Sequence, residues 1–170
     1  MSGEMNQVGP LGQGVLGLRW GCSAADVLAA YPAATQLPHG FIGVVAPAGM
    51  WGTRSAVGDI FMLTVDPGTG FKCMDFQFAP DSAHGLVDAL RSSLGEGRST
   101  AMRTVFGTFE HVHEWSTPQF GVIVSFTTRD GAPSSPAIAR GTAHVQRGPL
   151  ERSVVAKLMN PFQLPRDPVA

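Results

Sequence analysis

"CMDFQF", residues 73–78, is the stretch that decides the fold class. Large apolar residues alternate there with smaller or polar ones, Met74, Phe76 and Phe78 with Cys73, Asp75 and Gln77. Side chains on a β-strand point alternately to opposite sides, so this period of two predicts a strand with one buried and one wet face. "FIGVV" (41–45) and "IFMLTV" (60–65) are rich in β-branched and aromatic residues. We therefore expect three strands between residues 41 and 78.

A short helix is expected before these strands. Val15, Leu16, Leu18 and Trp20 indicate a strand. Ser23 and Asp26 then have the spacing of a capping box, in which each residue's side chain bonds the other's backbone N–H. The sequence therefore predicts a strand over 15–20 and a helix over about 24–30.

A longer helix is expected after the three strands. "PDSAHGLVDALRSSLGEG" (80–97) places leucine and valine at helical spacing, on a face formed by Leu86, Val87, Leu90 and Leu94. Asp81 or Ser82 has the side chain of an N-cap, and Gly95 is a C-terminal stop signal. After a polar loop, "FEHVHEW" (109–115) and "FGVIVSFTT" (120–128) predict a hairpin, and "TAHVQ" (142–146) a further strand.

This order of elements predicts an α+β fold. We expect an antiparallel sheet with two main helices packed on one of its faces, and the order suggests a duplication of a helix followed by strands. Three segments are predicted: a flexible N-terminus (1–14), a single α+β domain (15–148), and a C-terminal helix with an extended tail (149–170).

Composition narrows the range of partners and locations. The 170 residues carry a formal net charge of −1, with the basic residues scattered, which argues against binding to nucleic-acid phosphates. Apolar runs are of strand length, well short of the roughly 20 residues that span a bilayer, so we expect no membrane insertion. The first residues lack the basic and apolar pattern of an export signal. We therefore expect a cytoplasmic protein with Cys22 and Cys73 as free thiols.

The stretch "LGLRWGCSAADVLAAYP" (16–32) resembles the small bacterial outer-membrane assembly lipoproteins of the SmpA/OmlA type and the related β-lactamase-inhibitor-protein architecture. The likeness covers residues 15–34, and residues 80–148 are similar only in their general pattern. It implies a helix packed on an antiparallel sheet, and protein binding as the activity. The chain departs from these families in lacking a lipoprotein signal and in having Trp20 and Cys22 at positions usually less bulky. No functional residue is carried over from the match.

"EHVHE" (110–114) has the character of a metal site. On a strand, His111 and His113 point to the same face about 7 Å apart, with Glu110 and Glu114 on the other face. Two imidazoles alone hold an ion weakly, and a third ligand has to come from His84, His144 or Cys73. The alternative is a polar face of a hairpin, and on that ground we expect no tightly bound ion and no cofactor.

The sequence lacks a recognisable signature for nucleophilic catalysis. We therefore expect a non-enzymatic protein-binding module of a bacterial type, such as an adaptor, an inhibitor or immunity protein, or an assembly subunit. The alternative is a small metal-assisted enzyme using His111 and His113. A short terminal helix is marginal alone in water, so its apolar side has to be buried against another protein, a second copy or the chain's own sheet. The predicted partner-binding residues are Val154, Val155, Leu158, Phe162 and Leu164.

Overall fold

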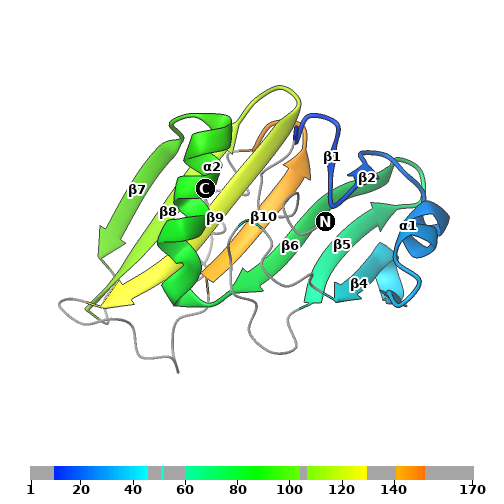
Figure 1. Ribbon diagram of the computed structural model, residues 1–170, viewed down its shortest axis with the longest axis horizontal. Coiled ribbons are helices and arrows are strands. Elements are labelled where there is room, and N and C mark those ends of the chain that lie inside the picture. The colour runs from blue at the N-terminus through cyan, green and yellow to red at the C-terminus, as the bar shows by residue number, and fades with distance from the viewer. Residues whose placement is uncertain (1–9, 46–50, 52–59, 104–106, 130–140, 152–170) are drawn as a thin grey trace, which may run out of the picture.

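The computed structural model describes residues 10–45, 51, 60–103, 107–129 and 141–151. Eight antiparallel strands form one sheet in the order β3-β4-β5-β6-β10-β9-β8-β7 (Figure 1). Their bounds are β3 Thr35–Gln36, β4 Phe41–Val45, β5 Ile60–Asp66, β6 Gly70–Phe78, β7 Arg98–Arg103, β8 Thr108–Ser116, β9 Phe120–Arg129 and β10 Gly141–Arg147. The sheet therefore consists of two meanders, β3–β6 and β7–β10, joined where β6 pairs with β10.

The N-terminal stretch forms a small hairpin and then a helix. β1 (Gly14–Val15) pairs with β2 (Leu18–Arg19), and Leu16 and Gly17 form the turn with positive φ angles of 58° and 71°. The prediction of one strand over 15–20 is wrong, because this turn folds it back on itself. Helix α1 (Ala24–Ala30) begins at the predicted capping box, with the backbone N–H of Asp26 donating to Ser23 Oγ and that of Ser23 donating to the Asp26 carboxylate.

Helix α2 (Ala83–Leu94) packs across the sheet over β8 and β9 (Figure 1). It follows a single 3₁₀ turn (Pro80–Ser82) and ends at Gly95, the predicted stop, whose positive φ of 84° is one that glycine adopts readily. Its face of Leu86, Val87 and Leu90 is buried, as the helical spacing predicts. Ser82 occupies the N-cap position, but its side chain makes no capping hydrogen bond.

The core lies between the sheet, α2 and the N-terminal hairpin. Its largest fully buried side chains include Phe71, Phe78, Leu63, Met74 and Leu90. Trp20 stacks on Phe71 with ring centroids 4.8 Å apart and so attaches the hairpin to β6. Leu11 is 2% exposed and belongs to this core, although it lies in the segment predicted as a flexible N-terminus.

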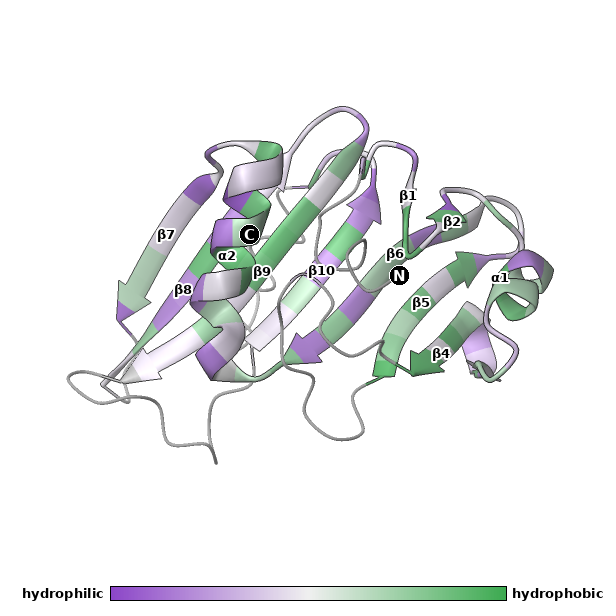
Figure 2. Cartoon of the chain, viewed as in Figure 1, coloured by the Kyte–Doolittle hydropathy of each residue, from purple (hydrophilic) through white to green (hydrophobic). Residues whose placement is uncertain are grey.

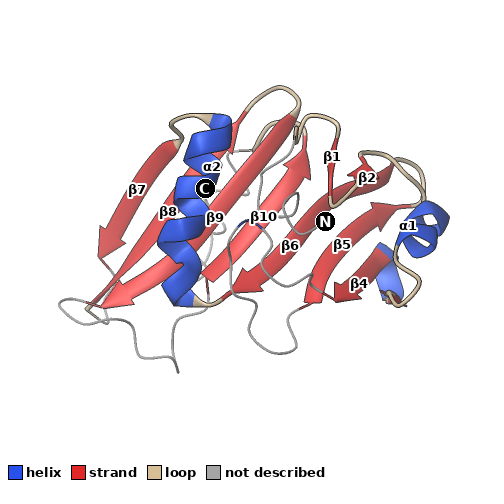
Figure 3. Cartoon of the chain, in the orientation of Figure 1, coloured by secondary structure: helices blue, strands red, loops and turns tan. Residues whose placement is uncertain are grey.

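The α+β class predicted from the sequence is wrong, because the protein is mostly β. Of the described residues, 51% lie in strands and 22% in helices (Figure 3). The polar loop expected after α2 contains the edge strand β7, whose sequence "RSTAMR" has too few apolar residues to reveal its pairing with β8. Val27 is the only buried residue of α1, and this helix lies beside β4, far from α2 (Figure 1). The two helices therefore do not form a continuous layer over one face of the sheet, as the α+β prediction required.

The two faces of the sheet carry different side chains, and we call the side opposite α2 the far face. On β6, Phe71, Met74, Phe76 and Phe78 are buried toward the core, whereas Cys73, Asp75 and Gln77 point to the far face. This confirms the alternation predicted for residues 73–78. The hydropathy of the strands is shown in Figure 2, where hydrophobic residues concentrate on β4, β5 and β9.

Candidate functional site

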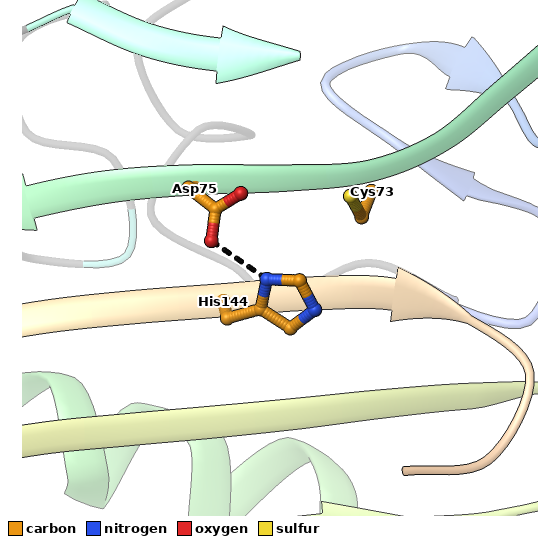
Figure 4. Close-up of side chains that lie close together, drawn as sticks. All are labelled: Cys73, Asp75 and His144. Atoms are coloured by element: carbon orange, nitrogen blue, oxygen red, sulfur yellow. Dashed lines mark hydrogen bonds and ion pairs between the residues drawn. The ribbon is translucent and has the colours of Figure 1, made fainter. Parts of the chain in front are cut away.

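The β6–β10 pairing brings an acid and an imidazole together on the far face. Asp75 lies directly opposite His144 in the antiparallel register, although the two residues are 69 positions apart in the chain. His144 Nδ1 lies 2.6 Å from Asp75 Oδ1 (Figure 4). The His144 side chain is 17% exposed and that of Asp75 53%, so the imidazole is mostly buried while the carboxylate faces solvent.

The second ring nitrogen of His144 also has a partner. Its Nε2 lies 3.0 Å from Gln146 Oε1, and Gln146 Nε2 donates to the carbonyl of Pro149 over 2.6 Å. Because the carbonyl of Pro149 can only accept, the Gln146 amide must present its oxygen to the ring. A carboxylate on one side and an amide oxygen on the other are both acceptors, so the arrangement favours a ring that carries both protons.

The charge state of His144 follows from this geometry. Burial of the ring lowers its pKa, but the hydrogen bond and the charge of Asp75, with the hydrogen bond of Gln146, outweigh burial and raise the pKa above the ordinary 6.5. The imidazolium form of His144 therefore persists to higher pH in the folded protein than in a free histidine.

Cys73 completes a group of three donor side chains. The thiol of Cys73, the carboxylate of Asp75 and a ring nitrogen of His144 all lie within 4.8 Å of one another, which makes them the one group of three potential metal ligands within the described ranges (Figure 4). Burial is the main effect and raises the pKa of the thiol, a hydrogen bond with Thr64 lowers it by less, and the charge of Asp75 raises it further. Cys73 is therefore a thiol at neutral pH and a poor nucleophile.

A shallow pocket of about 330 Å³ borders this group. Its lining includes Asp75 and His144, with Met62 of β5 and Ile123 of β9 on either side. Asp75 is opposite Met62 in the register, and Ile123 is opposite His144. The pocket therefore joins the charged pair to apolar side chains of the neighbouring strands.

Apolar side chains gather beside this pocket, and we call them the apolar patch: Leu37, Phe41, Val45, Ile60 and Met62. The first four are the exposed large hydrophobic residues among those that the structure describes. Val45 and Ile60 face each other across β4 and β5 and are 71% and 53% exposed. A Cβ added at Gly43 would lie 3.1 Å from Ile60 Cγ2 and 4.0 Å from Leu37 Cδ1, so these side chains converge above Gly43.

His111 and His113 lie on the same face of β8, as predicted, but that face is the one beneath α2. Both rings stack on Phe126, with centroids 5.0 and 5.8 Å away, and His84 of α2 meets the same phenyl ring edge-on at 5.6 Å. His111 Nε2 bonds to Thr128 Oγ1 at 2.8 Å, and His113 Nδ1 to Ser99 Oγ at 2.7 Å. In the described part of the chain these histidines take part in no group of three potential ligands.

Sequence reasoning missed the group formed by Cys73, Asp75 and His144. Its two strands were both predicted, and the alternation of 73–78 places Cys73 and Asp75 on the wet side. The missing information was that β10 pairs with β6, because strand order within a sheet is not encoded locally. The predicted partner-binding residues Val154, Val155, Leu158, Phe162 and Leu164, with the terminal helix and tail, lie outside the described residues.

Comparisons of the chain with protein-family models, with curated proteins and with solved structures give no significant match. The likeness to the outer-membrane assembly lipoproteins and the β-lactamase-inhibitor-protein architecture therefore rests on the short stretch of residues 15–34. Among the residues that the structure describes, no helix has the length and hydropathy needed to cross a membrane.

Proposed function

We propose that the chain is a non-enzymatic protein-binding module that contacts its partner through the apolar patch of β4 and β5. The observation that supports this function is the cross-strand pair Val45 and Ile60, two aliphatic residues on adjacent strands that are both more than half exposed. Scattered exposed hydrophobic residues are ordinary, whereas a contiguous group of them is typical of a contact surface.

The end of β4 near the sheet edge is a second feature that supports a contact with another protein. β3 has two residues and pairs with β4 only at Ile42 and Gly43, so Val44 and Val45 lie beyond its reach. A partner that approaches this corner meets apolar side chains on one face and a strand end that β3 does not cover. Such a corner fits a protein partner that presents aliphatic or aromatic side chains.

The partner in this proposal is a different protein, and the proposed location is the cytoplasm. The cytoplasmic location is supported by two free thiols, Cys22 and Cys73. A symmetric contact with a second copy of the chain is the alternative that the test distinguishes.

The test uses the purified full chain and a Val45→Ser, Ile60→Ser double variant. Partners captured from the native host are identified, purified and titrated against both proteins, so that affinity is measured between defined components. Full burial of each aliphatic side chain contributes about 1.5–3 kcal/mol, so we expect binding to weaken by at least about tenfold in the double variant. Arg98→Ser, at the opposite edge of the sheet, is the matched control and is expected to bind like the wild type.

Two results would overturn this function. One is an unchanged affinity in the double variant, in particular if truncation after Glu151 abolishes binding, which would place the contact in the C-terminal segment. The other is a concentration-dependent dimer, seen by analytical ultracentrifugation, that the double variant no longer forms. Truncation after Glu151 is preferred to an earlier cut because the backbone N–H of Leu150 bonds Ser116 Oγ at 2.9 Å.

A further inference from the structure

We propose that Cys73, Asp75 and His144 bind one divalent transition-metal ion of the zinc type. The three donor atoms come from two adjacent strands and lie within 4.8 Å of one another (Figure 4). The site is independent of the proposed protein-binding function, although it borders the same pocket.

The spacing of the donors is close to what a metal requires. Bonds of about 2.0–2.3 Å to zinc put the ligand atoms of a tetrahedral site about 3.3–3.8 Å apart. Cys73 and the other two donors must therefore approach by up to about 1.5 Å, while the hydrogen-bonded pair at 2.6 Å must separate by at least about 0.7 Å. The three residues already share one face of the paired β6–β10 ladder, so these movements are asked of side chains and not of the strands.

The chemistry of the donors selects the class of ion. A thiolate and an imidazole prefer zinc, cobalt and related ions over magnesium or calcium, which favour oxygen ligands. The exposed carboxylate of Asp75 gives the ion access from solvent, and a water molecule would supply the fourth ligand. Met62 and Ile123 flank the donors with apolar surface.

The arrangement also argues against the competing interpretation of these residues as a Cys-His-Asp catalytic triad. In such a triad the histidine Nε2 would accept the thiol proton, whereas here Nε2 is paired with Gln146 Oε1 at 3.0 Å. Asp75 also raises rather than lowers the pKa of the neighbouring thiol. A metal ion displaces the thiol proton of Cys73 and one ring proton of His144, and both protons are released to solvent, so ligation is the chemistry that these three groups share most directly.

The test starts from the chelator-treated full chain titrated with zinc and with cobalt. We expect one ion per chain, with a cobalt spectrum that contains a thiolate charge-transfer band, because Cys73 is a ligand. Cys73→Ser, Asp75→Asn and His144→Gln should each weaken zinc binding by at least about tenfold. Cys22→Ser is the matched control, since it removes the other thiol and should leave affinity and spectrum unchanged.

A measurement on the wild type keeps the proposal testable if a variant misfolds. Zinc should slow alkylation of Cys73 at mildly alkaline pH while leaving Cys22 unprotected, as read by peptide mass spectrometry. The proposal is overturned if the cobalt spectrum lacks the thiolate band, if zinc fails to protect Cys73, or if folded His144→Gln binds zinc like the wild type. Weakening by Asp75→Asn alone would indicate an adventitious ion only, and would equally overturn it.

Discussion

His144 and Asp75 face each other across β10 and β6, with Nδ1 and Oδ1 2.6 Å apart on the side of the sheet away from α2. The pair joins residues 69 positions apart and therefore ties the second meander to the first. It also raises the pKa of His144 above its ordinary 6.5.

We expect Asp75→Asn to lower the pKa of His144, as measured by NMR titration of the metal-free protein. A raised pKa in the folded state stabilises the protein fully below the unfolded value of 6.5, and this contribution is lost as the pH rises through the folded pKa. The variant should therefore lose more stability at about pH 5.5 than at about pH 9. Glu96→Gln, at an exposed carboxylate, is the control; an equal loss at both pH values in Asp75→Asn would contradict the assignment.

The two histidines beneath α2, His111 and His113, should give the stability of the protein the opposite pH dependence. Burial, with positive charge from His84 and, for His113, from Arg91, lowers the pKa of His111 and His113 below 6.5. A lowered histidine pKa means that the unfolded chain binds protons more readily, so stability falls as the pH drops below 6.5 toward the folded pKa values.

A His111→Gln, His113→Gln double variant should show a smaller loss of stability on acidification than the wild type. Urea unfolding at about pH 7.5 and about pH 5 measures the difference in each protein. Glutamine keeps hydrogen-bonding groups near Thr128 and Ser99, so a general loss of folding is not the expected effect. If the two proteins lose the same free energy of unfolding on acidification, the histidines are not responsible.

Leu90 lies at the centre of the buried face of α2 and is 0% exposed. Leu90→Ala should lower the free energy of unfolding by about 2–5 kcal/mol, because it removes buried methyl groups and leaves a cavity under the helix. Ser93→Ala, on the same helix, should change it by less than about 0.5 kcal/mol. A loss below about 1 kcal/mol in the leucine variant would show that α2 is not part of the main core.

Replacing each of two glycines by alanine should change the stability of the protein in opposite directions. At Gly70, φ is +73° and an added Cβ would collide with the carbonyl oxygen of Gly21, so Gly70→Ala should cost more than about 1 kcal/mol. At Gly85 in α2 an added Cβ meets nothing within 4 Å, so Gly85→Ala should stabilise the protein by about 0.5–1 kcal/mol. Thermal unfolding of both variants checks the pair, and a stable Gly70→Ala would show that the N-terminal hairpin packs differently on β6.

The sequence by itself determined the elements whose signals are local. The alternation of 73–78 specified which residues of β6 face the core, and the capping box of Ser23 and Asp26 specified the start of α1. These signals are local because a strand sorts successive side chains to opposite faces and a helix cap joins residues three apart. The same reasoning placed His111 and His113 on one face of β8.

Only the tertiary structure decided the fold class, the strand order and the candidate sites. β7 is a strand because β8 supplies its hydrogen bonds, and "RSTAMR" carries no apolar alternation that would predict it. His144 meets Asp75 and Cys73 because β10 inserts between β6 and β9, and no pattern within "TAHVQ" or "CMDFQF" specifies that neighbour. The physical reason is that hydrogen-bonded backbones can pair with many partners, and the choice among them is made by burying the whole core at once.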